Sequence, residues 1–301
     1  MAQRHFSMSA LQLNGTTFAG GQSFSYDPGL SVVSPTTDGA SDEIFHSVQR
    51  SMPRIDFTTL ELAALLNASF LAPTATPPFL ALNGTTGARL VGRLQATDSN
   101  AHAAGSVHES LVIARGLVYL TGINAQVGSP AELSGRILGK SADGDTNPVA
   151  LSQIAAPSEP NTIAPYILDS VSINGTVDDA CTGVSLTIEA GERFEHGPNV
   201  FPTFVGIGQG SAVKYRLQIT TDDESLHRSV GDIGAEQQVV VVIRNMTQGG
   251  TRGANTVTIT TNNGLLVSTG RSQSGQGKGS ITLEHHPRRN SGTAPITISV
   301  V

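Results

Sequence analysis

Charged side chains are scarce in this sequence of 301 residues. Asp, Glu, Lys and Arg make up only 14% of it, where about a quarter is typical of soluble domains. Lys and Arg number 18 against 24 Asp and Glu, which gives a formal net charge of -6. Because proteins that grip nucleic acid do so with clustered Lys and Arg, this balance argues against a phosphate-gripping nucleic-acid binder.

The chain also lacks tryptophan and has a single cysteine, Cys181. One cysteine cannot form an internal disulfide, and it excludes every cysteine-rich zinc scaffold. No run of about 18 apolar residues predicts a membrane-spanning helix, and residues 1–15 lack the apolar stretch of a signal peptide. We therefore expect a protein that is made in the cytoplasm and is not inserted into a membrane.

The sequence does contain many segments with the alternating pattern of β-strands. Residues 213–220, VKYRLQIT, alternate apolar and polar side chains, which buries one face of a strand and leaves the other wet. Similar alternation recurs in SLTIEA, TVTITT, SITLE and PITIS, and hydrophobic residues make up 38% of the chain. Disorder and a collagen-like polymer are excluded, and a folded, mainly β protein is predicted.

Four short segments of the first half recur, in the same order, in the second half. They are LNGT at Asn14 and INGT at Asn174, RIDFTTLE at 54–61 and RLQITTDD at 216–223, GLVYLTG at 116–122 and GLLVSTG at 264–270, and PVALSQI from Pro148 and PITISVV from Pro295. Recurrence of four segments in the same order predicts an internal duplication, in which one structural unit occurs twice.

The repeat predicts two tandem β-sandwich or barrel-forming domains, residues 1–154 and 170–301, joined by a Pro-rich linker over 155–169. Each domain is expected to carry one short helix, at about 58–67 and about 221–230. Thr58 with Glu61, and Thr221 with Glu224, have the spacing of a capping box at these helix starts.

Long turn-rich stretches precede the two matching strands, at residues 31–47 and 189–212. Loops of this length are usually functional. Because they occupy equivalent places in both repeats, we expect arms that reach toward another subunit.

The candidate metal ligands in the sequence are histidines and acidic residues. His285 and His286 are adjacent, so on a strand they point to opposite faces and cannot chelate one ion. Pro287 and two arginines follow them, which indicates an exposed basic turn. His102 and His108 have no ligand spacing and are expected on the solvated surface.

Asp143, Asp145 and Asn147 resemble the start of a calcium loop. Pro148 stands where an EF-hand needs Gly and Ile154 where it needs Glu, so an EF-hand is excluded and turn chemistry explains the segment. We expect no catalytic or structural metal.

The remaining candidates also favour structural roles. Asp222, Asp223 and Glu224 could form an acid/base pair, but a helix start attracts such charges. The segment GIGQG at 206–210 lacks the order of a phosphate-binding loop and is interpreted as a mobile loop. Cys181 aligns with Gly21 at an offset of 160 residues, which favours packing over reactivity. No catalytic residue and no cofactor are predicted, and the chain is not expected to be an enzyme.

The pattern resembles the major tail tube protein of long-tailed, siphovirus-type bacteriophages. The resemblance rests on RIDFTTLELAALL and RLQITTDDESL, the long loops before them, and the closing strands PVALSQI and PITISVV. It implies β domains with a flanking helix that assemble into sixfold rings around a shared barrel, with loops joining successive rings. Some members of the family carry the tube domain twice and use three chains per ring, which the duplication here resembles.

The implied function is that of a structural virion protein whose stacked rings form a channel for DNA delivery, with a lumen of net negative charge. Its partners would be further copies of itself, the tape measure, tail terminator and distal tail proteins, and DNA in transit; its location would be the virion tail. The alternatives are a duplicated β-sandwich module for carbohydrate or host-surface adhesion, or another virion or decoration protein. Ten Phe, four Tyr and no Trp offer few aromatic platforms for sugars. An enzyme ranks third.

Overall fold

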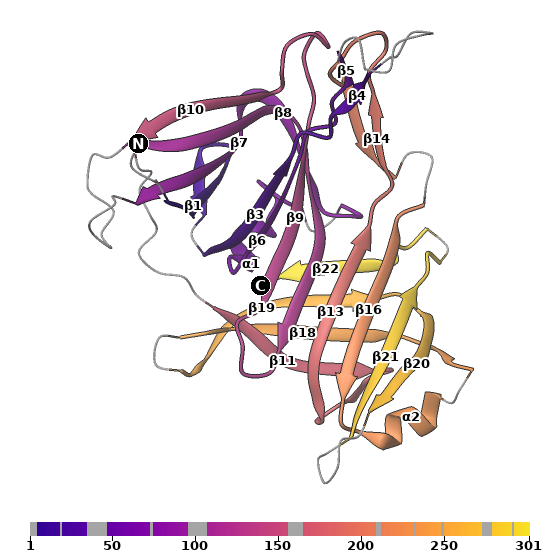
Figure 1. The fold of residues 1–301 in the computed structure, drawn as a ribbon. Coiled ribbons are helices and arrows are strands. Elements are labelled where there is room, and N and C mark those ends of the chain that lie inside the picture. The colour runs from indigo at the N-terminus through magenta and orange to yellow at the C-terminus, as the bar shows by residue number, and fades with distance from the viewer. Residues whose placement is uncertain are drawn as a thin grey trace.

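The structure is a computed structural model, and it describes residues 5–18, 20–34, 47–72, 75–95, 107–155, 165–208, 212–230, 233–247, 250–272, 279–290 and 292–301. Residues 156–164 of the predicted linker, and His102, lie outside these ranges. Within them the chain forms 22 strands and two short helices (Figure 1). The predicted mainly β class is confirmed.

The first half contains ten strands and one helix. They are β1 (His5–Leu13), β2 (Thr16–Phe18), β3 (Gly21–Asp27), β4 (Ser31–Val33), β5 (Ser47–Arg50), β6 (Arg54–Thr59), α1 (Leu62–Leu65), β7 (Phe79–Gln95), β8 (Val107–Gln126), β9 (Glu132–Gly139) and β10 (Val149–Ala155).

The second half contains twelve strands and one helix. They are β11 (Tyr166–Ile173), β12 (Thr176–Val177), β13 (Cys181–Glu189), β14 (Glu192–Glu195), β15 (Phe204–Ile207), β16 (Lys214–Thr221), α2 (Glu224–Val230), β17 (Ala235–Gln237), β18 (Val239–Met246), β19 (Arg252–Thr261), β20 (Gly264–Ser272), β21 (Ser280–Pro287) and β22 (Ile296–Val300). Ala155 and residues 166–169 were assigned to the linker from the sequence, but Ala155 lies in β10 and residues 166–169 lie in β11.

Strand pairing follows the same order in both halves. In the first half the antiparallel order is β2-β1-β7-β8-β10. In the second half the order β12-β11-β18-β19-β22 forms a separate five-stranded sheet. The closing strands of the sequence repeat, β10 and β22, therefore occupy equivalent edges.

A second set of strands also repeats, and it crosses from one half to the other. β3, β6, β9 and the end of β8 pair in that order, as do β13, β16, β21 and β20. Because β13 pairs with the end of β8, the two sets form one antiparallel run from β3 to β20. Figure 1 shows this run extending from β3 across to β20. We call it the shared sheet.

Irregularities in register recur at matching residues. The β3–β6 ladder shifts between Gly21 and Ser23, and the β13–β16 ladder shifts between Cys181 and Gly183, an offset of 160 residues. The β8–β9 ladder shifts between Leu120 and Gly122, and the β20–β21 ladder shifts between Ser268 and Gly270, an offset of 148. Bulges depend on local backbone geometry, so matched bulges give a residue-by-residue alignment of the two halves.

The helices lie where the sequence predicts them, but they are shorter, and the predicted capping boxes are wrong. Thr58 lies inside β6, and Glu61 precedes α1 without a side-chain cap. Before α2, Asp223 Oδ1 accepts the backbone N–H of Ser225 at 2.7 Å, which is a capping bond. Thr221 is instead fully buried at the end of β16, where its hydroxyl donates to Asp178 at 3.1 Å. The Thr221 hydroxyl also accepts the backbone N–H of Asp223 at 3.1 Å, so it bonds to the residue before the helix and not within its first turn.

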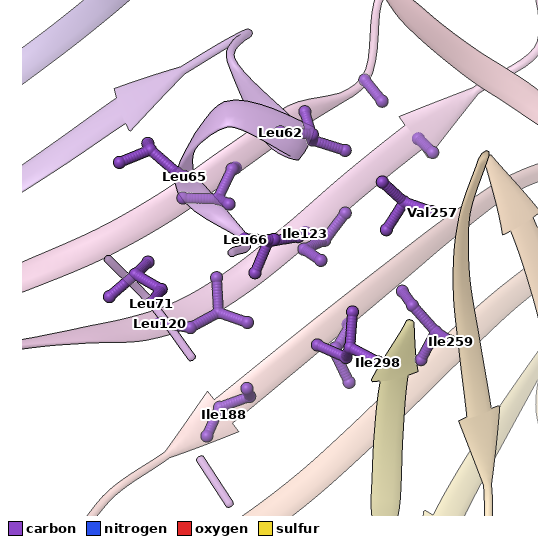
Figure 2. Packing of buried hydrophobic residues seen from close by; sticks show 14 of the residues in the cluster. Leu62, Leu65, Leu66, Leu71, Leu120, Ile123, Ile188, Val257, Ile259 and Ile298 are labelled. Carbon is purple, nitrogen blue, oxygen red and sulfur yellow. The ribbon is translucent and has the colours of Figure 1, made fainter. Parts of the chain in front are cut away.

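One hydrophobic cluster contains residues from both halves. Leu62, Leu65 and Leu66 of the α1 turn are fully buried. Figure 2 shows them beside Ile123 of β8, with Val257 of β19 close by. The α1 turn therefore fills the space between the shared sheet and the five-stranded sheet of the second half.

Candidate functional site

The acidic turn at 141–147 is explained by its own hydrogen bonds. Asp143 Oδ1 accepts the backbone N–H groups of Asp145 at 3.0 Å and of Thr146 at 2.9 Å, and the Ser141 hydroxyl at 2.8 Å. These donors hold the pKa of the Asp143 carboxyl well below its usual range. Asn147 Oδ1 accepts the N–H of Val149 at 3.0 Å. The predicted turn chemistry is confirmed, and among the described residues no three His, Cys, Asp or Glu side chains form a metal-binding group.

The two adjacent histidines do point to opposite faces of β21, but the predicted exposed turn is wrong for one of them. His285 is fully buried, and its Nε2 lies 2.9 Å from the carbonyl oxygen of Gln237. His286 is exposed and lies 2.8 Å from Glu284. Burial lowers the pKa of His285. The position of His108 in β8 is described, but its side chain is not.

A buried neutral histidine makes stability depend on pH. We expect acid to destabilise the protein partly through His285, and His285→Ile, which copies the matching Ile137, to remove that part. The pKa of His285 is lowered in the folded state. The stability that depends on this side chain being neutral is therefore fully present above the ordinary histidine pKa of about 6.5 and is lost as the pH falls. Asp178, whose pKa burial raises, acts in the opposite direction, but it is common to both proteins.

The measurement is the melting temperature by circular dichroism at about pH 7 and about pH 5. Leu283→Ile, which alters a fully buried side chain of the same strand without removing a titratable group, is the matched control and should keep the wild-type pH dependence. An unchanged drop in His285→Ile would contradict the prediction.

The other sequence candidates take structural roles. Glu224 lies within ion-pair distance of Arg271 and of Arg228, one helical turn away. Within GIGQG, Gly206 and Ile207 belong to β15, so the predicted mobile loop is wrong there, while residues 209–211 lie outside the described ranges. Burial, reinforced by the nearby Asp178, raises the pKa of the Cys181 thiol to about 12, so the thiol stays protonated at neutral pH.

The second long loop, residues 189–212, forms a hairpin of β14 and β15 that we call the second arm. Its Val205 joins a small apolar cluster with Leu117 and Tyr119 of β8 and Leu138 of β9. Backbone bonds fix it further: Ser51 donates to Val200 at 2.9 Å, Ser141 to Pro202 at 2.8 Å, and Phe201 to Gly144 at 3.0 Å. This arm covers the first half of its own chain, which differs from the expectation that both arms reach another subunit.

Ionic contacts anchor the same arm. The Tyr119 hydroxyl donates to Glu192 of β14, and Arg136 of β9 lies 2.7 Å from the same carboxylate. Arg136 also makes a two-pronged contact with Asp56 of β6. The hydrogen bond to Asp56, opposed by burial and supported by Glu192, raises the pKa of the Arg136 guanidinium. Burial and the Glu192 contact raise the pKa of Tyr119. A paired Arg between two carboxylates holds the arm in one orientation.

The described parts of the first long loop are residues 30–34 with β4 and 47–50 with β5, which together we call the first arm, while residues 35–46 lie outside the described ranges. Leu30, Val32 and Val48 are all exposed. Figure 1 places β4 and β5 at the same end of the molecule as β14. The first arm therefore exposes apolar side chains at the end of the molecule where the second arm buries its own.

The face of the shared sheet opposite the core is mainly polar, apart from the apolar patch of Leu117, Tyr119 and Leu138 that the second arm covers. Its described charged residues are Asp27, Asp56, Glu132, Glu189 and Glu284 against Arg54, Arg136, Lys214 and Arg216. Several are paired within the sheet, as Arg136 is with Asp56 and Arg216 with Glu284 at 3.1 Å. The face therefore carries a small excess of negative charge and neutralised cations.

The chain matches no known protein family, and no curated protein is significantly similar to it. In the part of the chain that the structure describes, no helix has the length and apolar character needed to cross a membrane.

Proposed function

We propose that this protein is the structural subunit of a hollow tube, a duplicated tail-tube-like protein that polymerises as stacked rings. The observation that carries the proposal is the shared sheet, which runs through both halves of the chain and leaves β3 and β20 as its outermost long strands. Open strands of this kind pair with other chains, and closure into a common barrel satisfies their backbone groups.

The repeated strand order supports two tail-tube-like domains in tandem. Each half contributes four neighbouring strands to the shared sheet and a five-stranded order beside it, with the long β8 serving in both sets of the first half. Three chains would then supply six equivalent units to a ring.

The polar face of the shared sheet suits passage of DNA. A lumen of unpaired Lys and Arg would bind phosphates at many points and stall the polymer. With Arg136 and Arg216 held by carboxylates, the face offers DNA little attraction. The proposed lumen is weakly rather than strongly acidic.

Negative-stain electron microscopy of the purified chain at rising protein concentration tests the proposal. We expect rings or tubes with threefold chain symmetry and a central channel. A monodisperse monomer at every concentration, or a sixfold ring of whole chains, would contradict it. If the monomer instead bound immobilised glycans, the adhesion module would replace the tube.

A further inference from the structure

We infer that a second copy of this chain docks at the open end of the shared sheet, so that β3 of one chain pairs with β20 of the next in the register of the internal β13–β8 junction. The inference rests on the proposed self-assembly and names the surface and the residues that carry it out.

The internal junction provides the template. β13 pairs with the end of β8 antiparallel, with Ser185 opposite Asn124, Leu186 opposite Ile123, and Thr187 opposite Gly122. This contact joins the second unit of the chain to the first. The described residues hold two such units, and within them the open edge of the second unit has no equivalent neighbour, which another copy of the chain would supply.

The matched bulges translate this register to the open strands. Subtracting 160 converts β13 into β3, and adding 148 converts β8 into β20. Ser25 of one chain then faces Ser272 of the next, Tyr26 faces Arg271, and Asp27 faces Gly270. In the described residues β20 pairs with β17 only through Gly264–Leu266, so Gly270–Ser272 keep one open edge.

Side-chain exposure supports the same contact. Phe24 of β3 is 37% exposed, whereas its counterpart Val184 at the internal junction is 4% exposed. Leu151 of β10 is 76% exposed, whereas its counterpart Ile298 of β22 is 5% exposed. The same apolar positions are buried where the neighbouring unit is present and exposed where it is absent.

The surroundings of the buried Ile298 show what would cover the exposed Leu151. Figure 2 places Ile298 with Val257 and Ile259 opposite the α1 turn. α2 occupies the matching place in the second unit, where it contacts β20 and β21. Leu151 of the next chain would therefore lie against α2.

The arms extend the contact. The second arm covers Leu117, which is only 8% exposed, while the counterpart of Leu117 in β20, Leu265, is 45% exposed. In the repeat, the first arm corresponds to the second arm. The first arm of the next chain would therefore lie over Leu265, and it carries the exposed Leu30, Val32 and Val48. Docking would bring these two apolar surfaces together, which is the burial that drives most association.

The contact is heterologous, because β3 and β20 are different surfaces. A heterologous contact forms a closed ring when its rotation closes and an open chain of subunits when it does not. Cross-linking at the predicted register separates these cases.

The test introduces Ser25→Cys and Ser272→Cys together in a Cys181→Ala background. Directly opposed strand residues have Cα atoms about 4.5–5.5 Å apart, within the range that a disulfide accepts. We expect oxidation to produce covalent dimers and trimers on a non-reducing gel. Ser25→Cys with Ser299→Cys, which moves one thiol to β22, is the matched control and should remain at the background level.

The outcomes distinguish the pairing from the tube. Tubes in the microscope without the Ser25–Ser272 cross-link would overturn this register and leave the proposed function standing. The specific cross-link in a ladder longer than three chains, without rings, would support the pairing and overturn the threefold ring. A cross-link no stronger than in the control, with no assembly, would overturn both.

Discussion

Leu66→Ala is expected to lower the free energy of unfolding by about 2–5 kcal/mol, the range for removing a buried leucine side chain. Leu66 is fully buried, and in Figure 2 it lies beside Ile123 of β8. Strand residues on two sides fix the size of this space, so it cannot collapse around an alanine. The loss of stability should therefore include the cost of a cavity in addition to the lost burial of apolar surface.

Urea unfolding followed by far-ultraviolet circular dichroism measures this change, at a concentration where sedimentation shows a monomer, since assembly would add apparent stability. Leu151→Ala is the matched control: it removes the same atoms from a side chain that is 76% exposed. Its expected loss is within about 0.5 kcal/mol. Equal losses in the two variants would show that α1 does not hold the halves together.

The alternating segments predicted the strands well because alternation is decided locally, by which side chains meet water. RIDFTT and RLQITT became β6 and β16, and GLVYLTG and GLLVSTG fell within β8 and β20. The same local patterns gave offsets of 160 and 148, and the bulges in the ladders repeat those offsets. The repeated order of segments was therefore visible before any strand was paired.

Contacts between distant segments could not be predicted in this way. β8 is one strand of twenty residues that pairs with four neighbours, and its role as the joint between the halves depends on β13, some sixty residues later. His285 comes three residues before a pair of arginines in the sequence, yet its side chain points into the core. The docking of the second arm depends on Arg136 and Glu192, which no local pattern connects.

The proposed contact surface for a second copy could be recognised only by comparing the two repeats. An exposed leucine alone carries little information, because much of any protein surface is apolar. Leu151 becomes informative because Ile298, at the same place in the second unit, is buried. The comparison turns a common observation into an expectation about what covers the residue.

Leu151→Asp is therefore expected to abolish self-association while leaving the isolated chain as stable as wild type. In the monomer the side chain is 76% exposed, so a carboxylate there stays hydrated. In the proposed contact the same carboxylate would be buried against α2, where Arg228 and Arg271 already lie within ion-pair distance of Glu224, and burying this further carboxylate costs several kcal/mol at each junction. A ring contains this contact once per chain, so the cost of burying the carboxylate arises at every contact in the ring.

Ser152→Asp is the matched control, since it places the same charge one residue along β10, on the opposite face of the strand. Its partner in the repeat, Ser299, is exposed, so this face stays in water at the internal junction too. Mass photometry and electron microscopy would report assembly, and thermal unfolding would report the fold. Assembly by Leu151→Asp as readily as by Ser152→Asp would place Leu151 outside the contact, because a buried carboxylate and a hydrated one cannot cost the same.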